Sequence, residues 1–430
     1  MIGVIADDIT GANDIGVMFN NGGFISDVYS YDSNVLQELS STMSDVLIFD
    51  TDSRLNKIEK AYEKVFQATK NIKQAGATQF FNKTCSVFRG NIGAEFDAML
   101  DALNEEFAVI VLGFPKNGRK TIHGIHMVHD EKLENSQFKN DPVHPMTESN
   151  LVDILQKQTN RKVTLINIET IKQGAQSIRA KLDNLRKEAF HYVILDVEEQ
   201  ADLHIIAQAI YDQKIICGSS AIAEEIPKVQ SKSSRLAQGD IQVPESDSSK
   251  GLFCAVGSLT PQTINQIRYA RDKGIKTIEL KTLGLISTID REEMQEELAE
   301  MVIQTILSGD DVIVHSTNTP DLVHETKQQA KELGMDNTAV SKLVSNAIAF
   351  ISEKVMKETK QYRFVIAGGD TSATVCQRLN IRGMRVWEEI QTGLPSCISL
   401  NKPSYLFILK SGSFGDETFL EKAFDHLRSQ

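Results

Sequence analysis

Short apolar segments alternate with helical patterns along most of this chain, and this alternation constrains the fold more than any other feature. In the first half, segments of strand length span residues 2–6, 25–28, 46–49, 79–81, 109–112, 163–166, 193–195 and 215–216. Helical patterns separate most of them, for example at 58–72, 94–103 and 178–185. Such alternation is typical of the α/β class, in which a mostly parallel sheet is flanked by helices.

The length of the chain indicates two domains. A chain of 430 residues is too long for one ordinary hydrophobic core. Residues 229–250 are rich in Ser, Gln, Lys and Asp and have little apolar periodicity, so we predict a linker there. Further strand-length segments follow at 252–256, 312–315, 364–367 and 406–409. The predicted domains are therefore 1–228 and 251–430, each with a mostly parallel sheet flanked by helices.

Composition excludes several functional classes. The formal net charge is −12 and no basic stripe with interleaved aromatic residues is present, so nucleic acid is not an expected partner. No apolar run has the roughly 18 residues of a membrane helix, and no secretory signal is recognisable. The five cysteines are scattered and form no CxxC pair, which indicates reduced thiols in a cytoplasmic protein. They are Cys85, Cys217, Cys254, Cys376 and Cys397.

Two adjacent carboxylates follow the first strand segment. Asp7 and Asp8 stand where this strand ends and a helical pattern begins, and Thr10 is the expected N-cap of that helix. Ligands of open α/β sheets bind at this edge. The two acids either contribute to such a site or only cap the helix and offset its dipole.

Cations and hydroxyls follow other strands of the first half. Arg54 comes after the segment 46–49, and Lys83 and Arg89 come after the segment 79–81. The ends of parallel strands meet at one edge, so these side chains should surround one crevice with Asp7 and Asp8. Acids and hydroxyls suit sugar hydroxyls, whereas Arg and Lys suit a carboxylate or a phosphate.

Two further patterns in the first half imitate known sites. Residues 113–121, GFPKNGRKT, nearly match the phosphate-binding P-loop, but Arg119 breaks the spacing and Pro115 removes a backbone donor. We therefore do not expect a P-loop. His123, His126 and His129 have a spacing of three and could share a helix face as metal ligands. The glycine and polar residues around them instead favour loop or substrate-contact histidines.

Three turns rich in Gly and Ser follow strands of the second half. They are GSLTP at 257–261, GGDTS at 368–372 and KSGSFG at 410–415. Glycine allows the backbone to approach a ligand closely, and the free N–H groups at the start of a following helix favour phosphate. The three turns together predict a phosphate-binding site in the second domain.

Taken together, these motifs resemble those of the four-carbon acid sugar kinase family, whose members phosphorylate compounds such as erythronate, threonate and 3-oxo-tetronate with ATP. The similarity spans nearly the whole chain. It is carried by ADDITGA at 6–12, TDSR at 51–54, KTCSVFRGN at 83–91, GFPKNGR at 113–119, DPVHPMTESN at 141–150, GSLTPQT at 257–263, GGDTS at 368–372, TGLP at 392–395 and LKSGSFG at 409–415.

The resemblance implies an N-terminal domain that binds the acid sugar, a C-terminal domain that binds the nucleotide, and an active site in the interdomain cleft. The residues implied on the sugar-acid side are Asp7, Asp8, Arg54, Lys83 and Arg89. Those implied to hold ATP are Ser258, Gly368, Gly369, Asp370, Thr371 and Gly412. The chain departs from the family at Cys85 and Val87, where an acid and a hydroxyl are more frequent, and at Asp370, where Glu is common.

The resulting hypothesis is an ATP-dependent sugar-acid kinase that uses Mg²⁺. Asp8 is the hypothetical catalytic base, and Asp7, its neighbour on the strand, would point the other way and be structural. The alternatives are a metal-dependent sugar-phosphate phosphatase that uses the two acids, and a non-catalytic sensor of a sugar acid and a nucleotide. The sugar acid, the hydroxyl that is phosphorylated, the metal ligands and whether the chain forms a homo-oligomer stay open.

Overall fold

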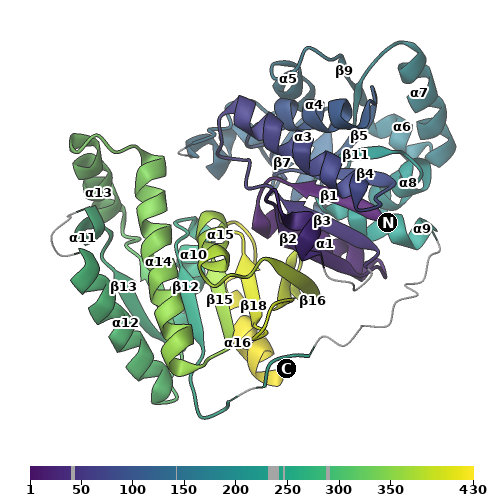
Figure 1. Ribbon diagram of the computed structural model, residues 1–430. Coiled ribbons are helices and arrows are strands. Elements are labelled where there is room, and N and C mark those ends of the chain that lie inside the picture. Colours follow the sequence, from purple (N-terminus) through teal and green to yellow (C-terminus); the bar gives the residue numbers. More distant parts are fainter. Residues whose placement is uncertain (40–43, 142, 231–241, 246, 287–290) are drawn as a thin grey trace. The chain divides into compact units, whose positions relative to one another are not determined.

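Two compact units make up the computed structural model, which describes residues 1–39, 44–141, 143–230, 242–245, 247–286 and 291–430. The units are Met1–Gly239 and Asp240–Gln430, and each has an α/β architecture (Figure 1). The predicted fold class, with mostly parallel sheets flanked by helices, is confirmed. Much of the predicted linker at 229–250 lies outside the described residues, so the linker stays a prediction.

The sheet of unit 1 is parallel throughout its described strands. These strands are β1 (Ile2–Ala6), β2 (Ser26–Ser30), β3 (Val46–Asp50), β4 (Gln79–Lys83), β5 (Ala108–Val111), β9 (Val163–Ile166), β10 (Tyr192–Leu195) and β11 (Ile215–Gly218). Their order is β2-β3-β1-β4-β11-β5-β10-β9. The central strands are apolar and buried on both faces, as expected for a sheet covered by helices on both sides.

Helices cover both faces of this sheet. The longer ones are α1 (Ile9–Asn21), α3 (Ile58–Gln74), α4 (Ile92–Leu103), α7 (Ala175–Lys187) and α8 (Gln200–Ile210), and the shorter ones are α2 (Val35–Glu38), α5 (Leu151–Gln156), α6 (Ile168–Lys172) and α9 (Glu225–Gln230). Right-handed crossovers place α1, α7 and α8 on one face and α3 and α4 on the other. The connections that leave β1 and β4 therefore run in opposite directions, which makes a topological switch point between these neighbouring strands.

A small antiparallel sheet forms where a loop was predicted around the three histidines. Its strands are β6 (Arg119–Ile122), β7 (Ile125–Val128) and β8 (Glu131–Lys132). Burial alternates along β6 and β7, so every second side chain is packed inside. The sequence showed no apolar alternation here, because the buried positions include the polar residues Arg119, Thr121 and His126.

Unit 2 has a mixed sheet in which parallel strands predominate. Its strands are β12 (Phe253–Val256), β13 (Lys276–Leu280), β14 (Val312–Ser316), β15 (Arg363–Ala367), β16 (Gly383–Gln391), β17 (Leu394–Ser399) and β18 (Leu406–Lys410). The order is β13-β14-β12-β15-β18-β17-β16, with β16 and β17 antiparallel to their neighbours. The sequence did not predict β13, β16 and β17, because charged or polar residues interrupt their apolar pattern.

The helices of unit 2 repeat the arrangement of unit 1. They are α10 (Pro261–Asp272), α11 (Thr282–Ile286), α12 (Arg291–Leu307), α13 (Pro320–Glu332), α14 (Asn337–Thr359), α15 (Gly369–Arg378) and α16 (Phe419–Ser429). Helices α12, α14 and α15 pack together on one face, whereas α10 packs with α16 on the other (Figure 1). The connections after β12 and β15 leave in opposite directions, so a second switch point lies between these strands.

No helix in the described part of the chain combines the length and the apolar character that crossing a membrane requires.

A substitution at the end of β11 tests the packing of the unit 1 sheet. Gly218 has φ 130°, and a Cβ atom there would lie 2.0 Å from the carbonyl oxygen of Val111, so the backbone would have to move. We expect Gly218→Ala to cost more than the roughly 1–2 kcal/mol of a left-handed alanine alone. Gly76→Ala is the matched control, since Gly76 has φ 101° and open space around it. Equal losses in the thermal midpoint of the two variants would contradict this packing.

Candidate functional site

Arg54 binds both adjacent aspartates at the switch point of unit 1. Its Nε and Nη2 donate to the two carboxylate oxygens of Asp7, each at 2.7 Å, and its Nη1 donates to Asp8. Asp7 follows β1 directly, and its backbone carbonyl accepts from the amides of Ser53 and Arg54. The loop after β3 is therefore fixed to the end of β1. Asp7 does not point away from Asp8, because both acids contact the same guanidinium.

Both carboxylate oxygens of Asp8 accept hydrogen bonds. It is the N-cap of α1, and its Oδ1 accepts from the backbone N–H of Gly11 at 2.5 Å and from the Thr10 hydroxyl at 3.1 Å. Its Oδ2 accepts from Arg54. The structure thus places Thr10 inside the helix, and the predicted N-cap at Thr10 is wrong. Burial opposes ionisation, but Arg54, Lys83 and the Gly11 N–H together hold the pKa of Asp8 below its ordinary value.

Lys83 is buried beside the first turns of α1. Its Nζ donates to the backbone carbonyl of Thr84 at 3.1 Å and lies 3.4 Å from Oδ2 of Asp14. The ammonium comes so close to the helix that a Cβ atom on Gly11 would lie 3.1 Å from it. Asp14 also accepts from the Ser220 hydroxyl at 2.7 Å. Burial raises the pKa of Asp14, although Lys83 and Ser220 act in the opposite direction.

Arg89 connects the same edge to the segment that follows β8. Its Nη1 donates to Oδ2 of Asp141 at 2.6 Å, and its Nε donates to the Cys85 sulfur at 3.3 Å. The other oxygen of Asp141 accepts from the backbone N–H of His144 at 2.8 Å, and the His144 ring contacts the Arg54 carbonyl. Burial opposes the thiolate of Cys85, but Arg89 and Arg54 lower its pKa below the ordinary thiol value.

Two further buried groups belong to this region and were not among the predicted site residues. Arg119 is 1% exposed, and burial lowers its pKa to about 10 while Cys85 and Asp14 favour its charged form. Glu95 accepts from the Ser53 hydroxyl at 2.8 Å, and burial together with Asp7 raises the pKa of Glu95 to about 8. Near neutral pH the Glu95 carboxyl is therefore largely protonated.

The histidines of the small sheet do not gather into a metal site. His126 is buried between the Thr121 hydroxyl and the Ser86 carbonyl, both at 2.9 Å, and burial lowers its pKa to about 3. The exposed His123 side chain instead faces Glu169. Among the described residues, no cluster of three His, Cys, Asp or Glu side chains is arranged to hold a metal ion. His126 therefore has a structural role.

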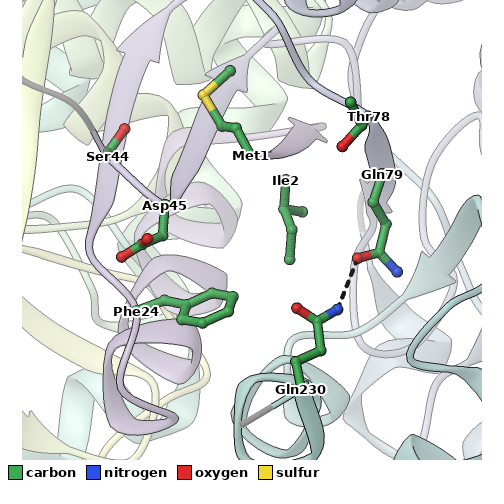
Figure 2. A pocket seen from close by; sticks show the side chains of 8 residues that line it. All are labelled: Met1, Ile2, Phe24, Ser44, Asp45, Thr78, Gln79 and Gln230. Carbon is green, nitrogen blue, oxygen red and sulfur yellow. Dashed lines mark hydrogen bonds between the residues drawn. The ribbon is translucent and has the colours of Figure 1, made fainter. Parts of the chain in front are cut away.

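A separate pocket opens at the opposite edge of the unit 1 sheet (Figure 2). It is lined by Met1, Ile2, Phe24, Ser44, Asp45, Thr78, Gln79 and Gln230. Gln230 donates to Gln79 across it, and Asp45 accepts from the backbone of Ile25. Among the described residues, no Lys or Arg side chain lines the pocket, so they offer no cationic side chain there for the carboxylate of a sugar acid.

The three glycine turns of unit 2 come together beside its switch point. The backbone N–H groups of Gly257 and Gly368 donate to the carbonyls of Ala367 and Lys410, which joins the ends of β12, β15 and β18. A Cβ atom on Gly412 would lie 2.4 Å from the Ser258 hydroxyl, and one on Gly368 would lie 3.2 Å from the Ser258 amide. The structure therefore brings together Ser258, Gly368 and Gly412.

The remaining predicted nucleotide residues lie at the start of α15. Gly369, Asp370 and Thr371 form its first turn, and the N-cap Gly368 has no side chain that could occupy the free N–H groups. Asp370 is exposed and accepts from the Ser341 hydroxyl at 3.2 Å. Free N–H groups at a helix start attract phosphate.

The side chain of Lys410 donates hydrogen bonds to the last of these turns. It is fully buried, and its Nζ donates to the Thr263 hydroxyl at 2.8 Å and to the carbonyls of Ser411 and Gly412 at 2.9 and 3.1 Å. The Gly412 carbonyl also accepts from the hydroxyls of Thr260 and Thr263. Burial lowers the pKa of Lys410 to about 7. The sequence did not indicate a buried role for Lys410, because a lysine at the end of an apolar strand usually extends into solvent.

Family models match both halves of the chain. A sugar-binding N-terminal domain matches residues 2–226, and a nucleotide-binding C-terminal domain matches residues 253–420. Among curated relatives, a 3-oxo-tetronate kinase of Haemophilus influenzae is 31% identical over 98% of this chain and 99% of its own length. Another, from Pseudomonas savastanoi, is 30% identical over 99% and 97%.

Solved structures resemble the chain over its whole length. A protein from Salmonella typhimurium LT2 is 27% identical with a TM-score of 0.80, and the similarity covers 98% of both chains. A Haemophilus influenzae protein is 28% identical with a TM-score of 0.72, over 99% of this chain and 100% of the other.

Lys410 gives the stability of the protein a measurable pH dependence. Its pKa is about 7 in the folded chain against an ordinary 10.5, so between these values the unfolded chain binds more protons and stability rises with pH. Lys410→Met removes this rise. We expect the difference in thermal midpoint, variant minus wild type, to be more negative at pH 10 than at pH 7. The exposed Lys342 gives the control Lys342→Met. A Lys410→Met difference that does not change with pH would contradict the assignment.

Proposed function

We propose that this chain, which belongs to the four-carbon acid sugar kinase family, transfers the γ-phosphoryl group of ATP to a hydroxyl of a four-carbon sugar acid. The observation that carries the proposal is the full-length similarity to curated 3-oxo-tetronate kinases. The buried cations at the switch point of the sugar-binding half support it. 3-Oxo-tetronate is therefore the first candidate substrate.

The sugar acid is assigned to the edge formed by Asp7, Asp8, Arg54, Lys83 and Arg89. A guanidinium has five N–H donors, of which Arg54 uses three on the two aspartates and Arg89 uses two on Cys85 and Asp141. Both arginines thus keep donors for a carboxylate, and Arg89 is the more exposed of the two. The aspartates orient Arg54 and balance its charge before the substrate arrives.

ATP is assigned to the three turns of unit 2. Phosphoryl transfer depends mainly on positioning and on stabilising negative charge. The N–H groups at the start of α15 and of the turn at Gly412 are suited to phosphate oxygens, and the lack of a side chain at Gly412 allows the Ser258 turn to approach closely. Lys410 adds positive charge next to this turn, and its Nζ donates hydrogen bonds to the carbonyls of Ser411 and Gly412.

Mg²⁺ fits this assignment through Asp370. Magnesium in kinases is commonly held by one or two carboxylates together with the phosphates of the substrate, so a complete protein cage is not needed. Asp370 is an exposed carboxylate in the first turn of α15, where the phosphates are assigned. When bound, the ion neutralises the charge of the β- and γ-phosphates.

The activity is tested by measuring ATP consumption with 3-oxo-tetronate, threonate and erythronate, each in both stereochemical series. We expect ADP to form with at least one of these acids, and mass spectrometry to find one added phosphoryl group on it. Phosphate release from a sugar phosphate without ATP would instead identify a phosphatase. Binding of both ligands without turnover would identify a sensor.

A pair of reciprocal variants tests the assignment of the two ligands. Gly412→Ala places a methyl group 2.4 Å from the Ser258 hydroxyl, so we expect the KM for ATP to rise about tenfold or more, equivalent to about 1.4 kcal/mol. The KM for the sugar acid should stay near the wild-type value. Arg54→Lys loses the paired contact with Asp7 and should show the opposite pattern. A folded Gly412→Ala enzyme with a normal KM for ATP would remove this turn from the site.

A further inference from the structure

Asp8 is poorly suited to accept a proton in the described geometry. A general base needs a free lone pair near the hydroxyl and a pKa close to the working pH. Both oxygens of Asp8 already accept hydrogen bonds, from Gly11 and Thr10 on one side and from Arg54 on the other. Accepting a proton on Oδ2 would weaken the contact with Arg54, and accepting one on Oδ1 would compete with the helix cap. The neighbouring cations also lower the pKa of Asp8, which makes it a weaker base.

Asp14 has the properties that Asp8 lacks. It lies on α1, six residues after Asp8, and is only 3% exposed. Its Oδ2 is held by the Ser220 hydroxyl at 2.7 Å and lies 3.4 Å from Nζ of Lys83. Its Oδ1 is buried and has no hydrogen-bond partner among the described residues. One oxygen is therefore fixed by the protein, and the other is available to a ligand.

Further buried polar atoms, on α1 and just after β4, also have no hydrogen-bond partner among the described residues. They are both amide atoms of Asn13, which precedes Asp14 on α1, and the hydroxyl of Thr84, which follows Lys83 at the end of β4. Asn13 is 1% exposed and Thr84 is fully buried. Buried polar groups are nearly always hydrogen-bonded in folded proteins. The unpaired groups of Asp14 and Thr84, which both lie beside Lys83, are therefore suited to a polar ligand such as a polyhydroxylated acid.

We propose that Asp14, positioned by Lys83 and Ser220, is the catalytic base that activates the attacking hydroxyl of the sugar acid. This inference rests on the proposed kinase function. The hydroxyl proton moves to Oδ1 of Asp14 while the hydroxyl oxygen forms a bond to the γ-phosphorus of ATP. The bond from that phosphorus to the β–γ bridging oxygen breaks, and ADP leaves. Asp14 then returns the proton to solvent. Asp8 keeps the separate role of holding Arg54 and capping α1.

The charges around Asp14 define the expected pH dependence. Lys83 from β4 favours the carboxylate, Asp8 at the start of α1 disfavours it, and Arg119 from β6 interacts with it favourably. Burial is the largest influence and raises the pKa of Asp14 above its ordinary value. The base is active only when ionised, so kcat/KM should increase with pH through this raised pKa. An Asp8 base would give an increase at lower pH, because the pKa of Asp8 is lowered.

The test compares Asp14→Asn with Asp8→Asn in the full-length enzyme, using the sugar acid that the ATP-consumption assay identifies. We expect Asp14→Asn to lower kcat by about 10²–10⁴-fold, the usual contribution of a general base, with little change in the KM for ATP. Asp8→Asn should raise the KM for the sugar acid more than it lowers kcat. Partial rescue of Asp14→Ala by added formate would support a proton-accepting role, which a purely structural carboxylate would not show.

Ser220→Ala is a milder variant that keeps the proposal testable if Asp14→Asn does not fold. The Ser220 hydroxyl lowers the pKa of Asp14, so its removal should move the rising limb of the kcat/KM profile to higher pH. An unmoved limb would overturn the proposal, and so would normal kcat in a folded Asp14→Asn enzyme. Wild-type enzyme that consumes no ATP with any acid would instead overturn the proposed function itself.

Discussion

The position of both candidate sites depends on one constraint. In each sheet, the chain leaves two neighbouring parallel strands in opposite directions. The connections after β1 and β4 cross to opposite faces of the unit 1 sheet, and those after β12 and β15 do the same in unit 2. No connecting helix covers the sheet edge between such strands, so a ligand can reach it. The side chains that the proposal assigns to the sugar acid begin at the first switch point, and those assigned to ATP begin at the second.

The buried cations at the two sheet edges have different partners. In unit 1, Arg54 and Lys83 are partly compensated by Asp7, Asp8 and Asp14. This balance orients the buried cations without a ligand, whereas an unpaired buried charge would be costly. In unit 2, the hydrogen-bond partners of Lys410 among the described residues are hydroxyl and carbonyl oxygens, and burial lowers its pKa. A bound triphosphate would supply negative charge near Lys410.

Local patterns predicted the fold and part of the site, since apolar segments and the polar residues after them are close in sequence. Arg54 and the glycine turns could be located in this way. Asp14 could not, because its partners Lys83 and Ser220 are 69 and 206 positions away and only the sheet order brings them together. The adjacent polar residues Asn13 and Asp14 within an otherwise apolar helix were the available signal. In the sequence, Arg119 was notable as the residue that breaks a P-loop pattern. Its burial adds it to the buried cations of the unit 1 site.

Helix α1 explains how two aspartates of one motif can have different roles. Six residues separate Asp8 from Asp14, which corresponds to about 9 Å along a helix. Asp8 follows β1 as the N-cap of the helix, so its carboxylate is bonded to the Gly11 N–H and to Arg54. Asp14 lies beyond that first turn, where the helix needs no cap, and one of its carboxylate oxygens has no hydrogen-bond partner in the described part of the chain. In the proposed mechanism the helix start secures the arginine while the second turn supplies the base. If one carboxylate had both roles, its protonation would weaken its contact with Arg54 at the moment of transfer.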